Sequence, residues 1–165
     1  MNHAELKQAI LRLLRRNARM PAAEIAARLQ ATTEAVASAI AEMEADRTIM
    51  GYSTIVNEDK TGSAEVRAII EVEVQPEREG GFDNVAMAIS RFPEVHSVSL
   101  VSGRYDLRLE VAGDSLQDVA RFVASKLASQ EGVKATTTHF LLRKYKEAGV
   151  SLHEEDQYER LKVVP

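Results

Sequence analysis

The stretch Val98-Ser-Leu-Val-Ser-Gly-Arg-Tyr-Asp-Leu-Arg-Leu-Glu-Val111 decides the fold of the second half of this chain. Its last part alternates in polarity, as a strand with one buried face does, and the apolar set is Tyr105, Leu107, Leu109 and Val111. Gly103 lies where the chain must reverse, because a positive φ angle costs little only for glycine. The stretch therefore predicts a β-hairpin with a tight turn at Ser102-Gly103-Arg104. An ordinary structural hairpin is the alternative to a functional one.

The segments on either side place this hairpin in a β-α-β-β-α-β order. Alternating residues predict a strand from Val66 to Gln75, and an apolar stripe predicts a helix over Phe82–Phe92. A second helix is predicted over about Leu116–Ser129, and a last strand over Val133–Tyr145. This order is that of the ferredoxin-like fold, in which four antiparallel strands carry two helices on one face.

The fold has consequences for the hairpin and its surroundings. We expect the two hairpin strands to be the central strands of the sheet. We expect the turn to be an edge feature, close to Thr136 and Thr138 of the last strand and available to a neighbouring subunit. The sheet face without helices needs a cover, and a partner subunit is the usual solution.

The first third of the chain has a different pattern, that of three short helices. Helices are predicted over residues 5–16, from Pro21 to about Gln30, and from Thr33 to about Asp46, with Thr32 as the N-cap of the third. A turn of about three residues between the last two helices is typical of a helix-turn-helix. Residues 47–56 then predict a strand, which would serve as a short wing or as a linker.

These patterns predict an α+β chain: an N-terminal helix-turn-helix domain of the winged type, followed by a ferredoxin-like βαββαβ domain. The predicted boundaries are 1–52 for the helix-turn-helix, 53–65 for a linker strand and loop, 66–145 for the βαββαβ domain and 146–165 for a charged tail. The tail is either a loose extension or an arm that reaches over a neighbouring subunit.

Composition excludes several classes of protein. The chain of 165 residues has no cysteine, which removes disulfides, thiol nucleophiles and thiolate metal sites. It has no run of 18 apolar residues, and its N-terminus lacks the apolar segment of a secretory signal, so we expect a soluble cytoplasmic protein. The net charge is −4, yet residues 1–52 carry seven basic and six acidic residues, or +1. This asymmetry permits a nucleic-acid contact at the N-terminal end without requiring one.

Several segments, in this order and spacing, resemble the Lrp/AsnC family of feast/famine transcription regulators. They are the helix-turn-helix from Pro21 to Ile40, the segment Ile49–Asn57, Phe92-Pro-Glu-Val95 with Val101-Ser-Gly-Arg-Tyr-Asp-Leu107, and Thr136-Thr-Thr138. The resemblance implies a homodimer made by packing two sheets, with dimers often assembled into octamers or other rings. It also implies a small amino acid or related metabolite bound near the turn, and a pseudo-palindromic operator in double-stranded DNA.

The turn carries groups that suit an α-amino acid, whose carboxylate and ammonium need different partners. Main-chain N–H groups of Ser102, Gly103 and Arg104 would meet the ligand carboxylate. Asp106, which lies beside them in the sequence, would take the ammonium. In the alternative, Asp106 makes only a hydrogen bond within the turn.

Other candidate effector-binding residues lie near the turn or on the last strand. Thr136 and Thr138 share one strand face and would add hydroxyl groups, although threonines there are also expected from β-propensity alone. The resemblance implies that Leu100 and Tyr105 line the pocket for the ligand's side chain.

The third helix is poorly suited to DNA, because residues 33–46 contain three Glu and one Asp and no Lys or Arg. Base readout relies mostly on Arg, Lys, Asn or Gln, and the family usually carries an arginine where this chain has Ala39. The candidate DNA-binding residues are Thr32, Thr33, Ala37, Ser38, Ala41, Arg28 and Arg47. Further phosphate contacts would come from Arg12, Arg15, Arg16 and Arg19, for which a solvated helix face is the alternative.

Two functions compete, and a third is disfavoured. In the first, the protein is a sequence-specific regulator whose weak recognition helix is compensated by avidity in an oligomer. In the second, it is a metabolite-sensing oligomeric co-regulator whose helix-turn-helix has lost DNA affinity. An enzyme is disfavoured, because the four histidines are scattered and no phosphate loop, metal motif or nucleophile elbow is present. We therefore expect no catalytic residue, no metal and no cofactor.

Overall fold

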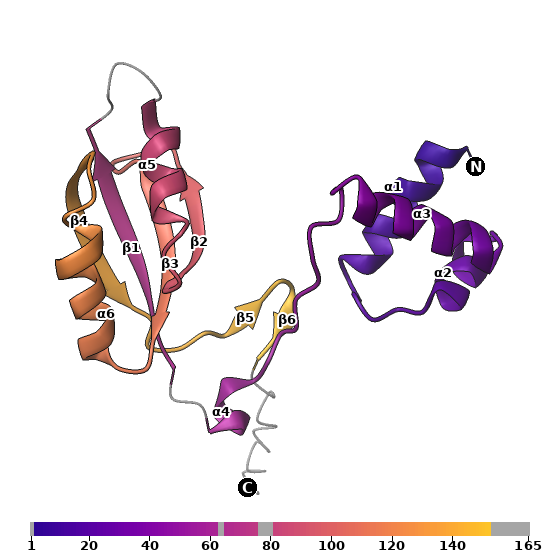
Figure 1. The fold of residues 1–165 in the computed structure, drawn as a ribbon. Coiled ribbons are helices and arrows are strands. Elements are labelled where there is room, and N and C mark those ends of the chain that lie inside the picture. Colours follow the sequence, from indigo (N-terminus) through magenta and orange to yellow (C-terminus); the bar gives the residue numbers. More distant parts are fainter. Residues whose placement is uncertain (1, 63–64, 76–80, 153–165) are drawn as a thin grey trace, which may run out of the picture. The chain divides into compact units, whose positions relative to one another are not determined.

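The computed structural model describes residues 2–62, 65–75 and 81–152. The chain forms two compact units, Met1–Ile55 and Val56–Pro165, and each is described by itself. The N-terminal unit is helical, and the C-terminal unit contains the sheet (Figure 1).

Three helices make up the N-terminal unit: α1 (His3–Leu14), α2 (Ala22–Leu29) and α3 (Thr33–Ala45). Apolar residues recur at helical spacing, so that each helix presents one stripe to the other two. These stripes form one core, and its fully buried members are Ile10, Ile25, Val36, Ala39 and Met43. The predicted helix-turn-helix is confirmed.

Polar side chains define where α1 and α3 begin. The Asn2 side chain accepts a hydrogen bond from the N–H of Glu5, and the Glu5 carboxylate accepts one from the N–H of Asn2. This reciprocal capping box starts α1 at His3 rather than at residue 5. Thr32 Oγ1 accepts a hydrogen bond from the N–H of Ala35 at 3.2 Å, as predicted for an N-cap.

The strand predicted over residues 47–56 is wrong. No strand is assigned between residues 2 and 62, and residues 51–57 have no regular secondary structure. A strand needs a neighbouring strand to satisfy its main-chain hydrogen bonds, and this part of the described chain offers none. The short helix α4 (Glu58–Thr61) follows.

The C-terminal unit has the predicted βαββαβ order. Its elements are β1 (Val66–Val74), α5 (Gly81–Ile89), β2 (Val95–Leu100), β3 (Leu107–Gly113), α6 (Leu116–Phe122), the π-helical turn η1 (Val123–Leu127) and β4 (Val133–Phe140). The strands are antiparallel and lie in the order β2-β3-β1-β4. The hairpin strands are therefore not both central as expected: β3 is central, but β2 is an edge strand.

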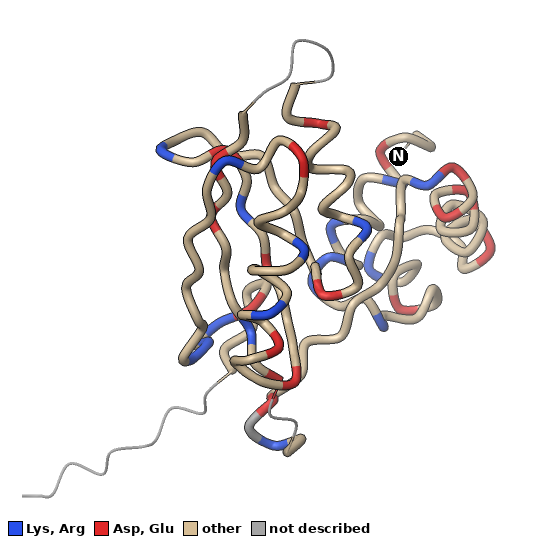
Figure 2. Tube along the Cα trace, turned by 60° about the vertical axis from the view of Figure 1, so that its left-hand side comes forward, with Lys and Arg blue, Asp and Glu red and all other residues tan. Residues whose placement is uncertain are grey.

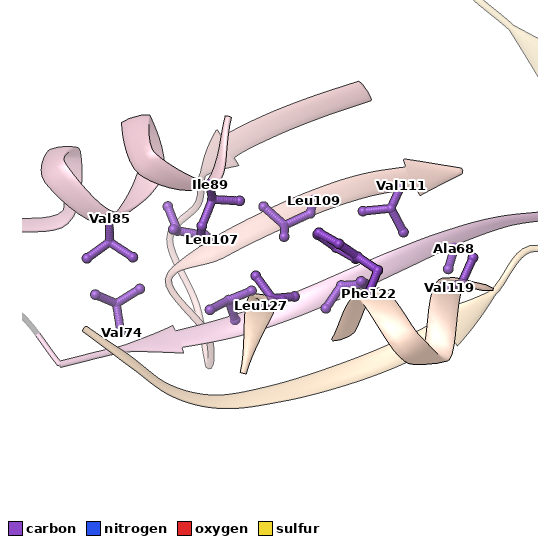
Figure 3. Packing of buried hydrophobic residues seen from close by; sticks show 12 residues of the cluster. Ala68, Val74, Val85, Ile89, Leu107, Leu109, Val111, Val119, Phe122 and Leu127 are labelled. Carbon is purple, nitrogen blue, oxygen red and sulfur yellow. The ribbon is translucent and has the colours of Figure 1, made fainter. Parts of the chain in front are cut away.

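The core of this unit lies between one face of the sheet and the two helices α5 and α6 (Figure 3). Leu107, Leu109 and Val111 are fully buried, which confirms the predicted alternation for these three residues. Each such side chain stabilises the fold by roughly 1.5–3 kcal/mol relative to an exposed one. Tyr105, the first member of the predicted set, precedes β3 in the loop and is half-buried. The rings of Phe92 and Phe122 meet edge to face, with centroids 5.6 Å apart.

The other face of the sheet is polar and only partly exposed. Its charged residues alternate with the buried ones and include Glu71, Glu73, Arg108, Glu110 and His139. Arg108 Nη2 lies 3.0 Å from Glu110 Oε1. A partner that covers this face must therefore match its charges, and cover by a second subunit stays a prediction.

The last strand is shorter than predicted, since β4 ends at Phe140 rather than at Tyr145. A small hairpin follows, made of β5 (Lys146–Glu147) and β6 (Val150–Ser151). Both residues of its turn have positive φ angles, 42° at Ala148 and 88° at Gly149, as a type I′ turn requires. The start of the predicted tail thus has regular structure, and residues 153–165 lie outside the described residues.

Candidate effector turn and DNA-binding surface

Residues 101–106 join β2 to β3 in a six-residue loop, which is wider than the tight turn predicted at residues 102–104. Main-chain hydrogen bonds hold this loop in place. The N–H of Val101 donates to the carbonyl of Asp106 at 2.9 Å. The N–H of Asp106 donates to the carbonyl of Val72 at 3.0 Å, which ties the loop to β1 as well. The tip, residues 102–104, is exposed. The loop therefore offers polar groups at its tip on a fixed frame.

The positive φ angle predicted for Gly103 is confirmed, at 146°. A Cβ atom built at this position would have no atom within 4 Å. Glycine is required there for its backbone conformation and not for space.

The Asp106 side chain also contributes to holding the loop. Its Oδ2 accepts a hydrogen bond from the N–H of Val74 at 2.8 Å. This contact is a structural role of the kind that the alternative assigned to Asp106. It leaves further acceptor capacity, because an ionised carboxylate has about four lone-pair sites. Binding of a ligand ammonium by Asp106 stays a prediction.

The structure does not bring the last-strand threonines close to the turn, and this expectation is wrong for a single chain. Thr136 pairs with Val72, which pairs with Leu107, which pairs with Leu100. Leu100 and Thr136 thus end one row across the sheet, three strand spacings or about 14 Å apart. Thr136 and Thr138 lie half-buried on the helix face of edge strand β4, because they pair with the buried residues of β1. The turn follows the opposite edge strand.

Glu71 was not predicted, yet it faces the turn. Its Oε2 lies 3.4 Å from Arg104 Nη2, and its Oε1 lies 3.5 Å from His139 Nε2. The Glu71 side chain is 19% exposed, whereas that of Arg104 is 84% exposed. Alternation alone placed Glu71 on the outer face of β1, but only the register of three strands places it between these two groups.

Helix α3 presents small side chains to solvent. Thr33, Ala37, Ser38 and Ala41 are exposed, and Ala37 and Ala41 lie on one face because they are four residues apart. Such a surface permits close approach of the helix backbone to a partner but offers few hydrogen bonds. Thr32 already uses its hydroxyl oxygen in the N-cap.

Glu42 of α3 is compensated from α1. Its Oε2 lies 3.0 Å from Lys7 Nζ and 2.9 Å from His3 Nε2. The hydrogen bonds from Lys7 and then from His3 lower the pKa of Glu42 below its ordinary value. Lys7 of α1 thus neutralises one of the four acidic residues between positions 33 and 46. His3 of α1 adds a hydrogen bond to the same carboxylate.

Two further acidic groups of this segment have partners within the N-terminal unit. Hydrogen bonds from the side chain and the N–H of Thr48 lower the pKa of Asp46. The hydroxyl of Tyr52 donates to Glu44 Oε1 at 2.7 Å, and this bond to a carboxylate raises the pKa of Tyr52. These neutral partners fix the two carboxylates in place but leave their negative charge on this part of the unit.

Ala39 lies on the buried side of α3. Its side chain has no exposed surface and packs in the three-helix core. An arginine at this position would not point to solvent on this backbone, so its absence removes no DNA contact from this chain.

The two candidate arginines outside α3 differ in their contacts. Arg28 Nη2 lies 2.7 Å from Glu24 Oε1, one turn earlier on α2. Arg47 follows α3 with a φ angle of 63° and is exposed. DNA binding by Arg28 would compete with an ion pair, whereas binding by Arg47 would not compete with any contact found among the described residues.

Metal sites and membrane spans were both sought in the part of the chain that the structure describes. Within residues 2–62, 65–75 and 81–152, no three His, Asp or Glu side chains are grouped so that they could hold a metal ion. No helix there is long and apolar enough to cross a membrane.

Both units match known protein families. Residues 67–151 match the Lrp/AsnC ligand binding domain, and residues 4–50 match a winged helix-turn-helix DNA-binding domain. The chain is 40% identical to the uncharacterized HTH-type transcriptional regulator YugG of Bacillus subtilis over 166 residues, which cover 100% of each.

Solved structures share the fold. MtbAldR is 25% identical and superposes with a TM-score of 0.74, covering 86% of this chain and 95% of that one. A transcriptional regulator of Neisseria meningitidis in complex with L-Met is 20% identical, with a TM-score of 0.68 over 87% of this chain and 92% of that one. With a family match over more than half of its length and a relative similar from end to end, the chain belongs to the Lrp/AsnC family of transcriptional regulators, with a helix-turn-helix and a ligand-binding domain.

Proposed function

We propose that this regulator controls genes of amino-acid metabolism and that its C-terminal unit binds a small amino acid or a related metabolite at residues 101–106. The observation that carries the proposal is the turn itself, in which exposed residues 102–104 closely precede Asp106 in the sequence and main-chain and Asp106 hydrogen bonds fix the loop. An α-amino acid has one anionic and one cationic group, which such partners match. The Neisseria regulator with the same fold holds an amino acid, which supports this class of ligand.

Each candidate residue has a proposed task. Main-chain N–H groups of Ser102, Gly103 and Arg104 bind the ligand carboxylate, and Asp106 binds the ammonium. Leu100, which is 59% exposed at the sheet edge, and Tyr105 contact the ligand's side chain. Thr136 and Thr138 lie too far from the turn in one chain, so we assign their hydroxyls to a pocket shared with another chain.

Calorimetric titration of the full chain with the twenty amino acids and related keto acids tests this proposal. One or a few of them should release heat and raise the unfolding temperature, because a ligand that binds only the folded state stabilises it. If none of them produces heat or a thermal shift, the amino-acid effector is ruled out.

The protein is proposed to be a homodimer that assembles further to an octamer. The polar sheet face and the exposed apolar side chains after β4, such as Leu142 and Val150, suit contacts with further copies. Light scattering at micromolar concentration should give a mass of at least two chains, and a monomer would contradict the proposal.

DNA is the proposed second partner, bound by Thr32, Thr33, Ala37, Ser38, Ala41, Arg28 and Arg47. The lack of any Lys or Arg in residues 33–46 favours one competing function, a metabolite-sensing co-regulator whose helix-turn-helix has lost DNA affinity. A mobility-shift assay with the DNA upstream of the protein's own gene separates the two. A shifted band that weakens steeply with salt supports DNA binding, whereas no shift at low salt supports the co-regulator. Neither function includes a catalytic step.

A further inference from the structure

The end of α1 and the loop to α2 concentrate positive charge. Arg12, Arg15, Arg16 and Arg19 fall within eight residues, and no acidic residue occurs between Glu5 and Glu24. We call these four residues the arginine corner. Lysine and arginine positions are blue in Figure 2. By contrast, residues 33–46 hold four acidic residues and no basic one, so charge is segregated within a unit whose net charge is close to zero.

The arginine side chains have no partners in the described chain. All four residues are exposed, and no ion pair or side-chain hydrogen bond joins any of them to another described residue. The other basic residues of α1 and α2 differ, because Lys7 contacts Glu42 and Arg28 contacts Glu24. The four guanidinium groups can therefore bind an anionic partner without breaking a contact to any residue that the structure describes.

The backbone that carries these arginines is well fixed. Arg15 is the C-cap of α1, and its N–H donates to the carbonyl of Leu11. Asn17 closes the following loop, since its N–H donates to Leu13 and its side chain accepts from the N–H of Arg19 at 3.0 Å. Met20 is buried at the end of the loop.

Helical spacing brings three of the four together, because Arg12 lies three and four residues before Arg15 and Arg16 and shares their face. Positive charge at a helix C-terminus also suits the helix dipole, but that effect concerns the last turn alone and does not account for Arg19. Three of the arginines thus share one helix face, and main-chain hydrogen bonds fix the backbone that carries all four.

In homeodomains, which are three-helix domains whose third helix reads the major groove, the loop between the first two helices contacts the DNA backbone. Phosphate contacts supply most of the sequence-independent affinity, and they require cations. Helix α3 contains no lysine or arginine, whereas the loop between α1 and α2 contains Arg15, Arg16 and Arg19.

We propose that the arginine corner is a phosphate-binding site for double-stranded DNA and provides the main electrostatic part of its affinity. This inference rests on the proposed DNA binding. It assigns affinity to the corner and leaves close contact with the bases to the small side chains of α3.

The test measures how the DNA affinity of the full-length protein depends on salt, with two duplexes of equal length. One duplex is the region upstream of the protein's own gene, and the other is unrelated. The variant Arg15→Gln/Arg16→Gln removes two charges, and the control Arg91→Gln/Arg121→Gln removes two exposed charges from the C-terminal unit. Thermal unfolding of both variants should match that of the wild type, because the altered side chains are exposed.

The corner variant should lose affinity by about 10- to 100-fold on both duplexes. The negative slope of log K against log salt should become shallower by about two for each bound domain. The control should keep the affinity and slope of the wild type. If the corner variant binds like the wild type, or loses affinity only for the upstream duplex, the proposed phosphate site is wrong although DNA binding stands. If the wild type binds neither duplex at low salt, the proposed DNA binding itself fails and the inference fails with it.

Discussion

Helix α3 and the turn over residues 101–106 are the two places where ligands are proposed to bind, and they are built in different ways. On α3, the exposed side chains of Ala37, Ser38 and Ala41 are separate from the buried ones that hold the helix in its core. In the turn, the group proposed to bind the ligand ammonium also holds the loop, since the Asp106 carboxylate accepts the Val74 N–H.

This difference has a physical consequence. A binding surface made of exposed side chains on a packed helix can change without loss of stability, because the buried face is unaffected. A site made of main-chain groups and the side chain that fixes them is less tolerant, because loss of that side chain also alters the frame. The small and acidic sequence of α3 is therefore compatible with an intact helix-turn-helix fold.

The largest expected effect tests the two sides of α3. Ala39→Arg puts a charge into the three-helix core, where Ala39 has no exposed surface, and should cost about 3–5 kcal/mol of unfolding free energy. The matched variant Ala41→Arg, on the exposed side, should change it by less than about 0.5 kcal/mol and should strengthen DNA binding. Urea unfolding measures the stability of the two variants, and a mobility-shift assay measures their DNA binding. Equal stability of the two variants would show that the buried and exposed faces of α3 are wrongly assigned.

The next largest effect tests the double task of Asp106. Asp106→Ala leaves the N–H of Val74 without its acceptor and should destabilise the C-terminal unit by about 1–3 kcal/mol. Asp106→Asn retains an acceptor oxygen and should keep most of this stability, yet it should lose the ligand because it lacks the negative charge. The unfolding free energy and the calorimetric ligand affinity are both measured for each variant. Wild-type ligand affinity in Asp106→Asn would contradict the ammonium site.

A smaller effect is expected at the tip of the turn. Gly103→Ala forces a Cβ onto a residue with a φ angle of 146° and should cost about 1 kcal/mol. Ser102→Ala, next to it and exposed, should cost less than about 0.5 kcal/mol. Equal midpoints of denaturation for the two variants would mean that the turn does not depend on glycine.

The smallest effect concerns the charges beside α3. Lys7 lowers the pKa of Glu42, so their contact stabilises the fold above the ordinary pKa of 4.5 and is lost as the pH falls through the lowered value. Lys7→Met should therefore lower the unfolding temperature slightly at pH 7, and the difference should vanish once the pH has fallen through the lowered pKa of Glu42. A difference that persists in acid would assign the effect to packing of the lysine stem and not to the ion pair.

The local features of both units were predictable from the sequence. Thr32 as an N-cap, Gly103 with positive φ and the alternation that buries Leu107 and Leu109 are properties of short segments. Each follows from the conformational preference of one residue or from the period of side chains along one element.

The errors concern pairing between segments. Residues 47–56 are predicted to form a strand but have no neighbouring strand among the described residues. The hairpin has one edge strand because β3 lies between β2 and β1. The distance between the turn and Thr136 and the approach of Glu71 to Arg104 depend on the same long-range register. Periodicity carries no information on which strand lies beside which.

The sequence by itself determined the βαββαβ order, the helix-turn-helix and the separation of positive charge in residues 12–19 from negative charge in residues 33–46. Only the tertiary structure decided which charges are compensated. Lys7 and Glu42 come together through helix packing, whereas the four arginines of the corner have no acidic partner among the described residues. Only the tertiary structure showed that the turn is held by Asp106 and follows the edge strand opposite to the one that carries the threonines. The physical reason is that helix and strand periods arise from neighbours in the chain, whereas ion pairs and strand order arise from contacts between distant segments.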